Sequence, residues 1–264
     1  MKLLFSEHKS DYDHYIFPYA IWAFPEHDET PSRIFERGFL PSTLSLNRFY
    51  MCRQIRIRLT HFQRSSENRR IIKKGEGISY KLLPILQFEF TKKRKEFCKS
   101  YCDLSFGKYV MSYQRLDRIF TSELVTHVLV YNDTSTENEI GFVSLYLEPK
   151  VLAFYYYSFY DLNYKSKNLG MYMMTTAVDY FSQQAYESIY LGSCYSKNAL
   201  YKTQFRGVEF FNGFRWSNNL EELKYLIDRD SGQVSCHLLE SEEYLNRFYD
   251  QQVNVMSNHF GFTT

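Results

Sequence analysis

The stretch VTHVLVYNDTSTENEIGFVSLYLEPKVLAFYYYSF, residues 125–159, decides the fold of this chain. It contains runs rich in β-branched and aromatic residues at 125–131, 139–147 and 151–159, which are typical of strands. Polar residues separate the first two runs, and Glu148-Pro149-Lys150 forms a tight turn before the last. Connections this short join antiparallel neighbours, so the stretch predicts an antiparallel meander.

The chain after the meander alternates between helix and strand. Residues 169–185 carry apolar side chains at helical spacing, at Leu169, Tyr172, Met173, Thr176, Ala177, Tyr180 and Phe181. We expect a short buried strand at 188–191, a helix at 198–205 and a strand at 208–211. The fold class predicted is α/β (α+β): a mixed sheet with flanking helices, helix 169–185 on one face, and strands splayed near Phe159 and Tyr190.

This order of elements resembles the GNAT acyltransferases, which bind the pyrophosphate of coenzyme A at the N-terminus of the helix after the meander. A glycine-rich loop lets the phosphates approach the backbone. Here the loop reads YKSKNLG, residues 164–170, and Gly170 is its one glycine. Because Lys165 and Lys167 still favour an anion, we expect an anionic donor other than coenzyme A.

Positive charge is concentrated in residues 48–95, which contain fourteen Lys or Arg and three Glu and so carry +11, whereas the overall net charge is +2. Such a segment attracts phosphate backbones regardless of sequence. Within it, Ser65 or Ser66 is expected to cap a helix that Gly75-Glu76-Gly77 ends. The cations that this helix projects, expected to contact nucleic-acid phosphates, are Arg69, Arg70, Lys73 and Lys74.

The rest of the N-terminal half is less regular. Residues 1–47 suggest strands and turns, and residues 80–101 predict a Lys/Arg-rich helix. Residues 52–59 alternate in polarity, which predicts a half-buried strand whose exposed face is basic. The expected domains are a smaller basic N-terminal subdomain at 1–100, a GNAT-like transferase domain at 101–230 and a C-terminal extension at 231–264.

Several blocks, taken in order, resemble the arginyl-tRNA–protein transferases and their bacterial leucyl-transferring branch. The blocks are Ser66–Lys74, Cys52 with Ile55-Arg56-Ile57, Phe159-Tyr160-Asp161, Asn168–Tyr172, Tyr190-Leu191-Gly192, Tyr201-Lys202, Phe205, Glu209 and Trp216. The resemblance implies transfer of an amino acid, of arginine or leucine type, from aminoacyl-tRNA to a protein N-terminus. It also implies that Cys52 and Arg56 bind the acceptor.

The cysteines depart from that family, whose N-terminal part normally carries a cysteine cluster. Cys52 stands alone in its region, and Cys98 and Cys102 lack a second pair at ligand spacing. We therefore expect free thiols, no metal and no cofactor. The block Cys194–Lys202 is also altered, which leaves the choice of acceptor open.

The reaction needs few chemical groups, because an aminoacyl ester is already activated and the attacking group is an amine. The protein must position both partners, accept a proton and stabilise an oxyanion. Asp161 is the candidate for handling the proton. Tyr190, Tyr201 and Lys202 are candidates for hydrogen bonding to the oxyanion or the tRNA 3′ end, with Tyr201 and Lys202 ranked first. Lys165 and Lys167 are expected to hold the 3′-terminal nucleotide.

Two other interpretations stay open: a GNAT acyltransferase that uses acyl-CoA, and a non-catalytic relative that binds RNA or protein. The sequence has 44% hydrophobic residues, enough for a large core, and no apolar run near the roughly 20 residues of a membrane span. A soluble cytoplasmic protein is expected, with aminoacyl-tRNA and an acceptor protein or peptide as partners and no binding to membrane or DNA.

Overall fold

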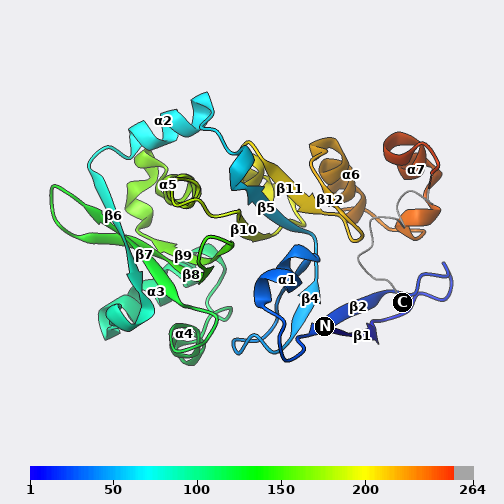
Figure 1. Cartoon of the computed structure of the whole chain (residues 1–264), viewed down its shortest axis with the longest axis horizontal. Helices are drawn as coiled ribbons and strands as arrows, with labels where there is room; N and C mark the ends of the chain where they lie inside the picture. Colours follow the sequence, from blue (N-terminus) through cyan, green and yellow to red (C-terminus); the bar gives the residue numbers. More distant parts are fainter. Residues whose placement is uncertain (253–264) are drawn as a thin grey trace. The chain divides into compact units, whose positions relative to one another are not determined.

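A computed structural model gives the structure of the chain (Figure 1) and describes residues 1–252. The chain divides into two compact units. The first unit contains Met1–Arg56, Ser193–Gln204 and the chain from Val208 onward, and the second contains Ile57–Gly192 and Phe205–Gly207. The domain boundaries expected at residues 100 and 230 stay predictions.

The second unit is built on a mixed sheet in which neighbouring strands follow the order β10-β9-β8-β7-β6. The strands are β6 (Ile78–Pro84), β7 (His127–Asp133), β8 (Glu139–Glu148), β9 (Leu152–Tyr160) and β10 (Ser188–Ser193). Strands β6 to β9 pair antiparallel, whereas β10 runs parallel to β9. The predicted meander is therefore confirmed, and β6 extends it by one strand.

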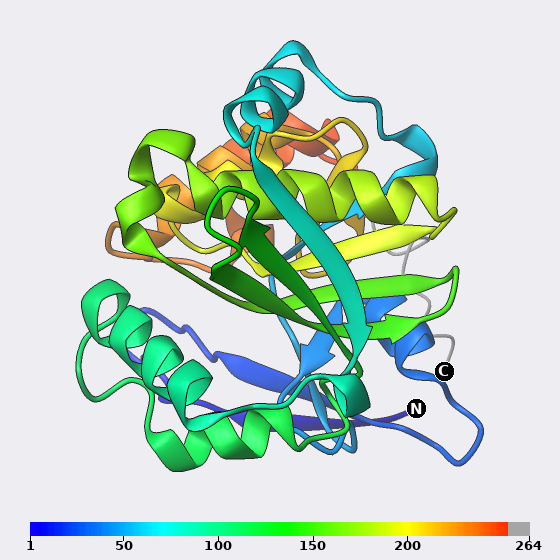
Figure 2. The same cartoon turned by 90° about the vertical axis from the view of Figure 1, so that its left-hand side faces the viewer.

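Helices cover both faces of these strands, as Figures 1 and 2 show. Helices α5 (Leu169–Gln183) and α2 (Ser66–Lys74) lie on one side, and α3 (Lys92–Ser105) and α4 (Tyr113–Phe120) lie on the other. Most of α5 is buried, in keeping with its apolar sequence. The predicted mixed sheet with flanking helices, and the position of helix 169–185 on one face, are confirmed.

Strands β9 and β10 separate as predicted. Their parallel pairing joins Ser188, Ile189 and Tyr190 to Leu152, Ala153 and Phe154, whereas β9 continues unpaired with β10 to Tyr160. The opening lies at the end of β9 from which the chain leads into α5. This is the place where the GNAT resemblance puts the donor.

The first unit contains a small antiparallel sheet of order β1-β2-β4-β3 and a second group of strands and helices. The sheet is formed by β1 (Lys2–Glu7), β2 (Tyr19–Phe24), β3 (Phe39–Pro41) and β4 (Phe49–Met51). The other elements are α1 (Pro31–Glu36), the start of β5 (Gln54–Arg58), the 3₁₀ helix η4 (Lys197–Thr203), β11 (Val208–Phe211), β12 (Trp216–Ser217), α6 (Leu220–Asp230), η5 (Leu238–Glu240) and α7 (Glu242–Tyr249).

The helix predicted at residues 80–101 is wrong in its first half. Ile78–Pro84 is strand β6, the 3₁₀ helix η2 follows at Ile85–Gln87, and α3 begins only at Lys92, capped by Thr91. Pairing with β7 along the whole of β6 satisfies backbone groups that the local pattern assigned to a helix. The segment 198–205 is likewise a 3₁₀ helix, η4, rather than a regular α-helix.

The exposed basic face predicted for residues 52–59 is also wrong. Gln54 and Arg56 are 0% and 3% exposed, respectively, so β5 is buried on both sides over these residues. The period-2 pattern located the strand correctly, but it could not reveal what covers the polar face. The Arg56 side chain is covered by residues from α1, β11 and β12.

Helix α2 forms as predicted and is held against α5 by a close approach. The Ser65 hydroxyl accepts a hydrogen bond from the Asn68 amide at 3.1 Å, and the Asn68 side-chain oxygen accepts one from the Ser65 amide at 3.0 Å. At the other end, a Cβ built on Gly75 would lie 2.1 Å from the Tyr172 ring. Gly75 is therefore required by the approach of α5.

Replacing Gly75 by Ala should destabilise the protein by about 1–3 kcal/mol, because the added methyl group has to displace the Tyr172 ring. Gly232→Ala is the matched control, since its Cβ would meet its nearest neighbour at 3.7 Å. That variant should stay within about 0.5 kcal/mol of wild type. Urea unfolding measures both, and equal midpoints for the two variants would contradict the prediction.

Candidate functional site

Lys202 is the chemically most unusual side chain among the predicted site residues. It lies in η4, is half-buried, and its ammonium group donates to the Ser193 carbonyl oxygen at 2.9 Å. Desolvation lowers the pKa of Lys202, while the nearby thiols of Cys194 and Cys52 act in the opposite direction. A lysine in this setting loses its proton more readily than one in water.

Two buried thiols lie close to Lys202. Cys52 and Cys194 are 4% and 0% exposed. Burial raises the pKa of Cys52 to about 12, although a hydrogen bond with Tyr50 and the charge of Lys202 oppose the shift. Burial also raises the pKa of Cys194. Both thiols are therefore protonated near neutral pH and are poor nucleophiles.

Residues 193–195 are fixed against Arg53. The Cys194 amide donates to the Arg53 carbonyl at 2.7 Å, and the Arg53 amide donates to the Tyr195 hydroxyl at 2.8 Å. The Arg53 guanidinium lies 4.9 Å from the centre of the Tyr195 ring and pairs with Asp230 at 2.8 Å. These interactions bring the start of the Cys194–Lys202 block next to Cys52, as the expected acceptor region requires. Tyr201, in the same block, is 44% exposed.

Arg56, expected to bind the acceptor, is engaged within the first unit. Its guanidinium pairs with Glu36 at 2.6 Å and with Glu209 at 2.7 Å, and it stacks 3.8 Å from the centre of the Trp216 ring. The sequence resemblance had singled out Glu209 and Trp216 without assigning them a role. They hold Arg56 in place, together with Glu36, which sequence reasoning missed.

Gln54 is a residue that sequence reasoning also missed. Its side chain is 0% exposed, and neither its amide nitrogen nor its amide oxygen has a hydrogen-bond partner among residues 1–252. Each unpaired buried polar group costs about 1–3 kcal/mol. Its polar character within an alternating strand was visible in the sequence, but its burial was not.

Asp161 and Tyr190 belong to the second unit. Asp161 follows β9 and accepts a hydrogen bond from the Asn163 amide at 2.9 Å. It lines a cavity of about 650 Å³ together with Tyr164, Glu139 and Arg94. Tyr190, by contrast, is 2% exposed within β10. Asp161 is therefore accessible to a small molecule, whereas Tyr190 is covered in this structure.

The predicted donor loop contains the 3₁₀ helix η3 (Leu162–Lys167) and leads into α5 through Asn168. Asn168 has a left-handed backbone (φ 51°) and makes no side-chain cap. A Cβ built on Gly170 would lie 2.6 Å from the Tyr160 hydroxyl oxygen, so the Tyr160 ring occupies the space beside this glycine. The side chain of Lys165 lies outside the described part of the structure.

The predicted tRNA-binding cations lie on the exposed surface of α2. Arg70 pairs with Glu67, with 2.7 Å between Nε and Oε2, and Arg69 donates to the Arg64 carbonyl at 2.7 Å. Lys73 and Lys74 are exposed and form no ion pair within residues 1–252. Lys167 donates to the Glu76 carbonyl at 3.1 Å. Lys167, in the predicted donor loop, thus lies next to the end of α2.

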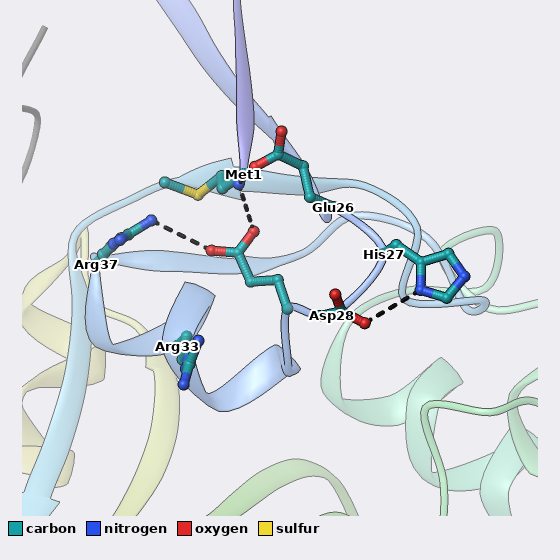
Figure 3. Close-up of a pocket in the computed structure, with 7 residues that line it drawn as sticks. Met1, Glu26, His27, Asp28, Arg33 and Arg37 are labelled. Atoms are coloured by element: carbon teal, nitrogen blue, oxygen red, sulfur yellow. Dashed lines mark hydrogen bonds and ion pairs between the residues drawn. The ribbon is translucent and has the colours of Figure 1, made fainter.

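A second cavity, of about 420 Å³, lies in the first unit and is shown in Figure 3. Its walls are charged, and the charges pair with one another. The Met1 ammonium group pairs with Glu26 and, at 2.7 Å, with Glu29, which also pairs with Arg37 at 3.2 Å. Because its carboxylates are already engaged, we assign this cavity a role in fixing residues 26–37.

Clustered metal ligands and membrane-spanning helices are both lacking in the described residues. Within residues 1–252, no group of three or more His, Cys, Asp or Glu side chains is arranged to hold a metal ion. In the same part of the chain, no helix is both long and apolar enough to cross a bilayer.

Comparison with known proteins finds distant likenesses among solved structures. No protein-family model and no curated protein matches the sequence. The C-terminal domain of a putative lysylphosphatidylglycerol synthetase from Agrobacterium fabrum is 14% identical over 62% of this chain and 51% of that chain, with a TM-score of 0.42. FemX is 8% identical over 54% of this chain and 52% of that chain, with a TM-score of 0.40.

This chain thus spans about half the length of these solved structures. Likenesses at this TM-score carry no inference about activity. Because no family model matches, membership of the arginyl- and leucyl-tRNA–protein transferase family stays a proposal.

Replacing Lys202 by Met should change how stability depends on pH. The pKa of Lys202 is below its ordinary value of 10.5 in the folded protein. Between the two values the unfolded chain binds the proton more tightly, so this group makes the wild type more stable as pH rises. The buried thiols act in the opposite direction, but both proteins contain them.

Urea midpoints measured between about pH 7 and about pH 10 should therefore show wild type gaining stability relative to Lys202→Met as pH rises. The control is the variant Lys224→Met, which changes an exposed lysine. The difference in urea midpoint between this variant and wild type should not change with pH in this way. Parallel pH profiles for wild type and Lys202→Met would contradict the assignment of a lowered pKa.

Proposed function

We propose that this chain transfers an aminoacyl group from aminoacyl-tRNA to the α-amino group of a protein or peptide N-terminus. The observation that carries the proposal is the half-buried Lys202, which donates to the Ser193 carbonyl at 2.9 Å in the block of buried Cys194. Desolvation lowers the pKa of its amine, so we assign it the role of base. The resemblance of the sequence blocks supports the arginine- or leucine-type donor. The sequence leaves one alternative open, a non-catalytic relative that still binds RNA or protein.

The donor loop supports tRNA over coenzyme A. Pyrophosphate has to approach successive backbone N–H groups at the start of a helix. The loop has one glycine, Gly170, and the Tyr160 ring occupies the space on its Cβ side. A tRNA needs less from this loop, because its phosphates gain binding energy from the cations of α2.

The proposed chemistry uses few groups. The α-amine of the acceptor attacks the carbonyl carbon of the aminoacyl ester, forming a C–N bond and an oxyanion. The Lys202 amine accepts the proton that the nucleophile loses, and the Tyr201 hydroxyl donates to the oxyanion. Collapse breaks the C–O bond to the tRNA ribose, which takes up a proton as it leaves. Asp161 is the alternative proton acceptor.

Incubation with a pool of charged tRNAs and acceptor peptides tests the proposal. We expect peptide-dependent loss of one class of aminoacyl ester, and a drop of about 10²-fold or more for Lys202→Met. Lys224→Met, on the exposed face of α6, is the matched control and should keep full activity. If no aminoacyl ester is consumed under any condition, the proposed transfer activity is wrong.

A titration separates the two donor classes. Acetyl-CoA should show no binding below millimolar concentration, because Gly170 is the one glycine of the loop, whereas tRNA should bind at low salt. Micromolar affinity for acetyl-CoA together with no affinity for tRNA would favour the acyl-CoA acyltransferase instead.

Replacing cations of α2 should weaken tRNA binding and flatten its salt dependence by about one unit of log–log slope for each phosphate that the protein no longer neutralises. The Lys73→Ala/Lys74→Ala double variant should weaken binding more than Arg69→Ala/Arg70→Ala, because Arg70 is already paired with Glu67. Filter binding at several salt concentrations measures the slope. The control Lys108→Ala/Arg118→Ala removes two exposed cations elsewhere in the second unit, and an equally large effect there would contradict a specific role for α2.

A further inference from the structure

The cavity beside Asp161 carries charges that its own residues leave unpaired. It has a volume of about 650 Å³ and lies where the start of α3, the start of β8 and the turn after β9 meet. Small-molecule sites in proteins usually have volumes of this size. All the residues that line it belong to the second unit, so this unit alone supplies the site.

One ion pair forms a fixed part of the cavity wall. The Arg94 guanidinium pairs with the Glu139 carboxylate, at 2.6 Å between Nη2 and Oε2 and 3.0 Å between Nε and Oε1. The same guanidinium lies 4.1 Å from the centre of the Phe88 ring. Because the two charges of this pair neutralise each other, the charge available to a ligand comes from other residues.

Lys93 supplies an unpaired cation at the start of α3. Four consecutive cations begin this helix, and three of them pair with carboxylates: Lys92 with Glu96 at 3.8 Å, Arg94 with Glu139, and Lys95 with Asp117. Lys93 is the fourth, and it lines the cavity. Within residues 1–252 it forms no ion pair, so its ammonium group is available to an anionic group of a ligand.

Asp161 supplies the opposite charge in the same cavity. Its carboxylate accepts a hydrogen bond from the Asn163 amide at 2.9 Å and has no cation partner among the side chains that the structure describes. The ring of Phe97 and the buried side chain of Ile140 line the same space. The cavity thus offers an unpaired ammonium group, an unpaired carboxylate on a half-buried residue, and apolar surface.

We propose that this cavity binds a small zwitterion, an amino acid or a dipeptide, whose carboxylate pairs with Lys93 and whose ammonium group pairs with Asp161. Three carboxylates and two cations line the cavity, which gives it a net charge of −1. This excess of negative charge disfavours a phosphate-bearing ligand, whereas a zwitterion satisfies both unpaired groups at once. The third carboxylate, that of Glu89, is exposed and stays hydrated.

Binding of a zwitterion here does not depend on aminoacyl transfer, but it bears on the proposed chemistry. The ammonium group of the ligand neutralises Asp161, which is the alternative proton acceptor. A carboxylate held in an ion pair is a weaker base than a free one. With the cavity occupied, Lys202 is therefore left as the base.

Calorimetric titration without tRNA tests the proposal with leucine and with leucyl-leucine. Each zwitterion is compared with its C-terminal amide, which lacks the carboxylate, and with its N-acetyl form, which lacks the ammonium group. We expect one zwitterion to bind at millimolar concentration or below, and each of its two analogues to bind about tenfold more weakly. The tighter of the two zwitterions identifies the ligand as an amino acid or a dipeptide.

Two variants assign the charges of the ligand to their partners. Lys93→Met should abolish the preference for the zwitterion over its amide and keep the preference over its N-acetyl form. Asp161→Asn should have the reverse effect, whereas a merely structural role of either residue would weaken all ligands alike. Lys92→Met is the matched control, because it removes the neighbouring cation, which does not line the cavity, and it should keep both preferences.

No binding of either zwitterion at millimolar concentration would overturn the proposal. So would preferences that survive in both cavity variants, preferences that are lost in Lys92→Met, or a higher affinity for inorganic phosphate than for the zwitterions. The titration contains no tRNA, so its failure leaves the transfer reaction standing. Failure of the transfer assay likewise leaves zwitterion binding standing.

Discussion

The second unit depends on the packing of one aromatic side chain, Tyr172 of α5. Its ring lies against Gly75 at the end of α2, its hydroxyl donates to the Ile78 carbonyl at 3.1 Å, and its ring centre lies 6.2 Å from that of Tyr131 in β7. A single residue thus touches a helix, the start of the edge strand and the sheet. This packing positions helix α2 against α5, whose first residues follow the predicted donor loop.

In the first unit, desolvation shifts the pKa of three neighbouring side chains, Lys202, Cys52 and Cys194. The same desolvation that lowers the pKa of Lys202 raises that of Cys52 and Cys194. Desolvation favours the neutral form of each group, so acid and base groups shift in opposite directions. Both thiols therefore keep their protons to a higher pH than free cysteines, whereas the Lys202 amine loses its proton at a lower pH than a free lysine.

Patterns within short stretches of the sequence were sufficient to predict the elements that form between residues close together in the chain. The meander, helix α5 and the Ser65-capped helix α2 were predicted from alternation, helical spacing and a capping residue. Strand β6 was missed because it forms by pairing with β7, which is distant in sequence. The face of β5 was misjudged for the same reason, since Glu36, Glu209 and Trp216 come from three separate parts of the chain.

The candidate site could be predicted only in part. Lys202 and Asp161 could be named from the order of the sequence blocks and from their chemistry. The lowered pKa of Lys202 and the unpaired amide of Gln54 follow from burial, which no local pattern reveals.

The cation–carboxylate cluster around Arg56 has a consequence for synthesis of the chain. Its members come from residues 36, 56, 209 and 216, so the first unit cannot be completed until the ribosome has passed the last of them. The second unit, which is almost continuous in sequence, can fold earlier. At typical translation rates, the N-terminal segment waits on the order of ten seconds for its partners. During that interval Arg56 lacks Glu209 and Trp216, two of the groups that surround it in the folded protein.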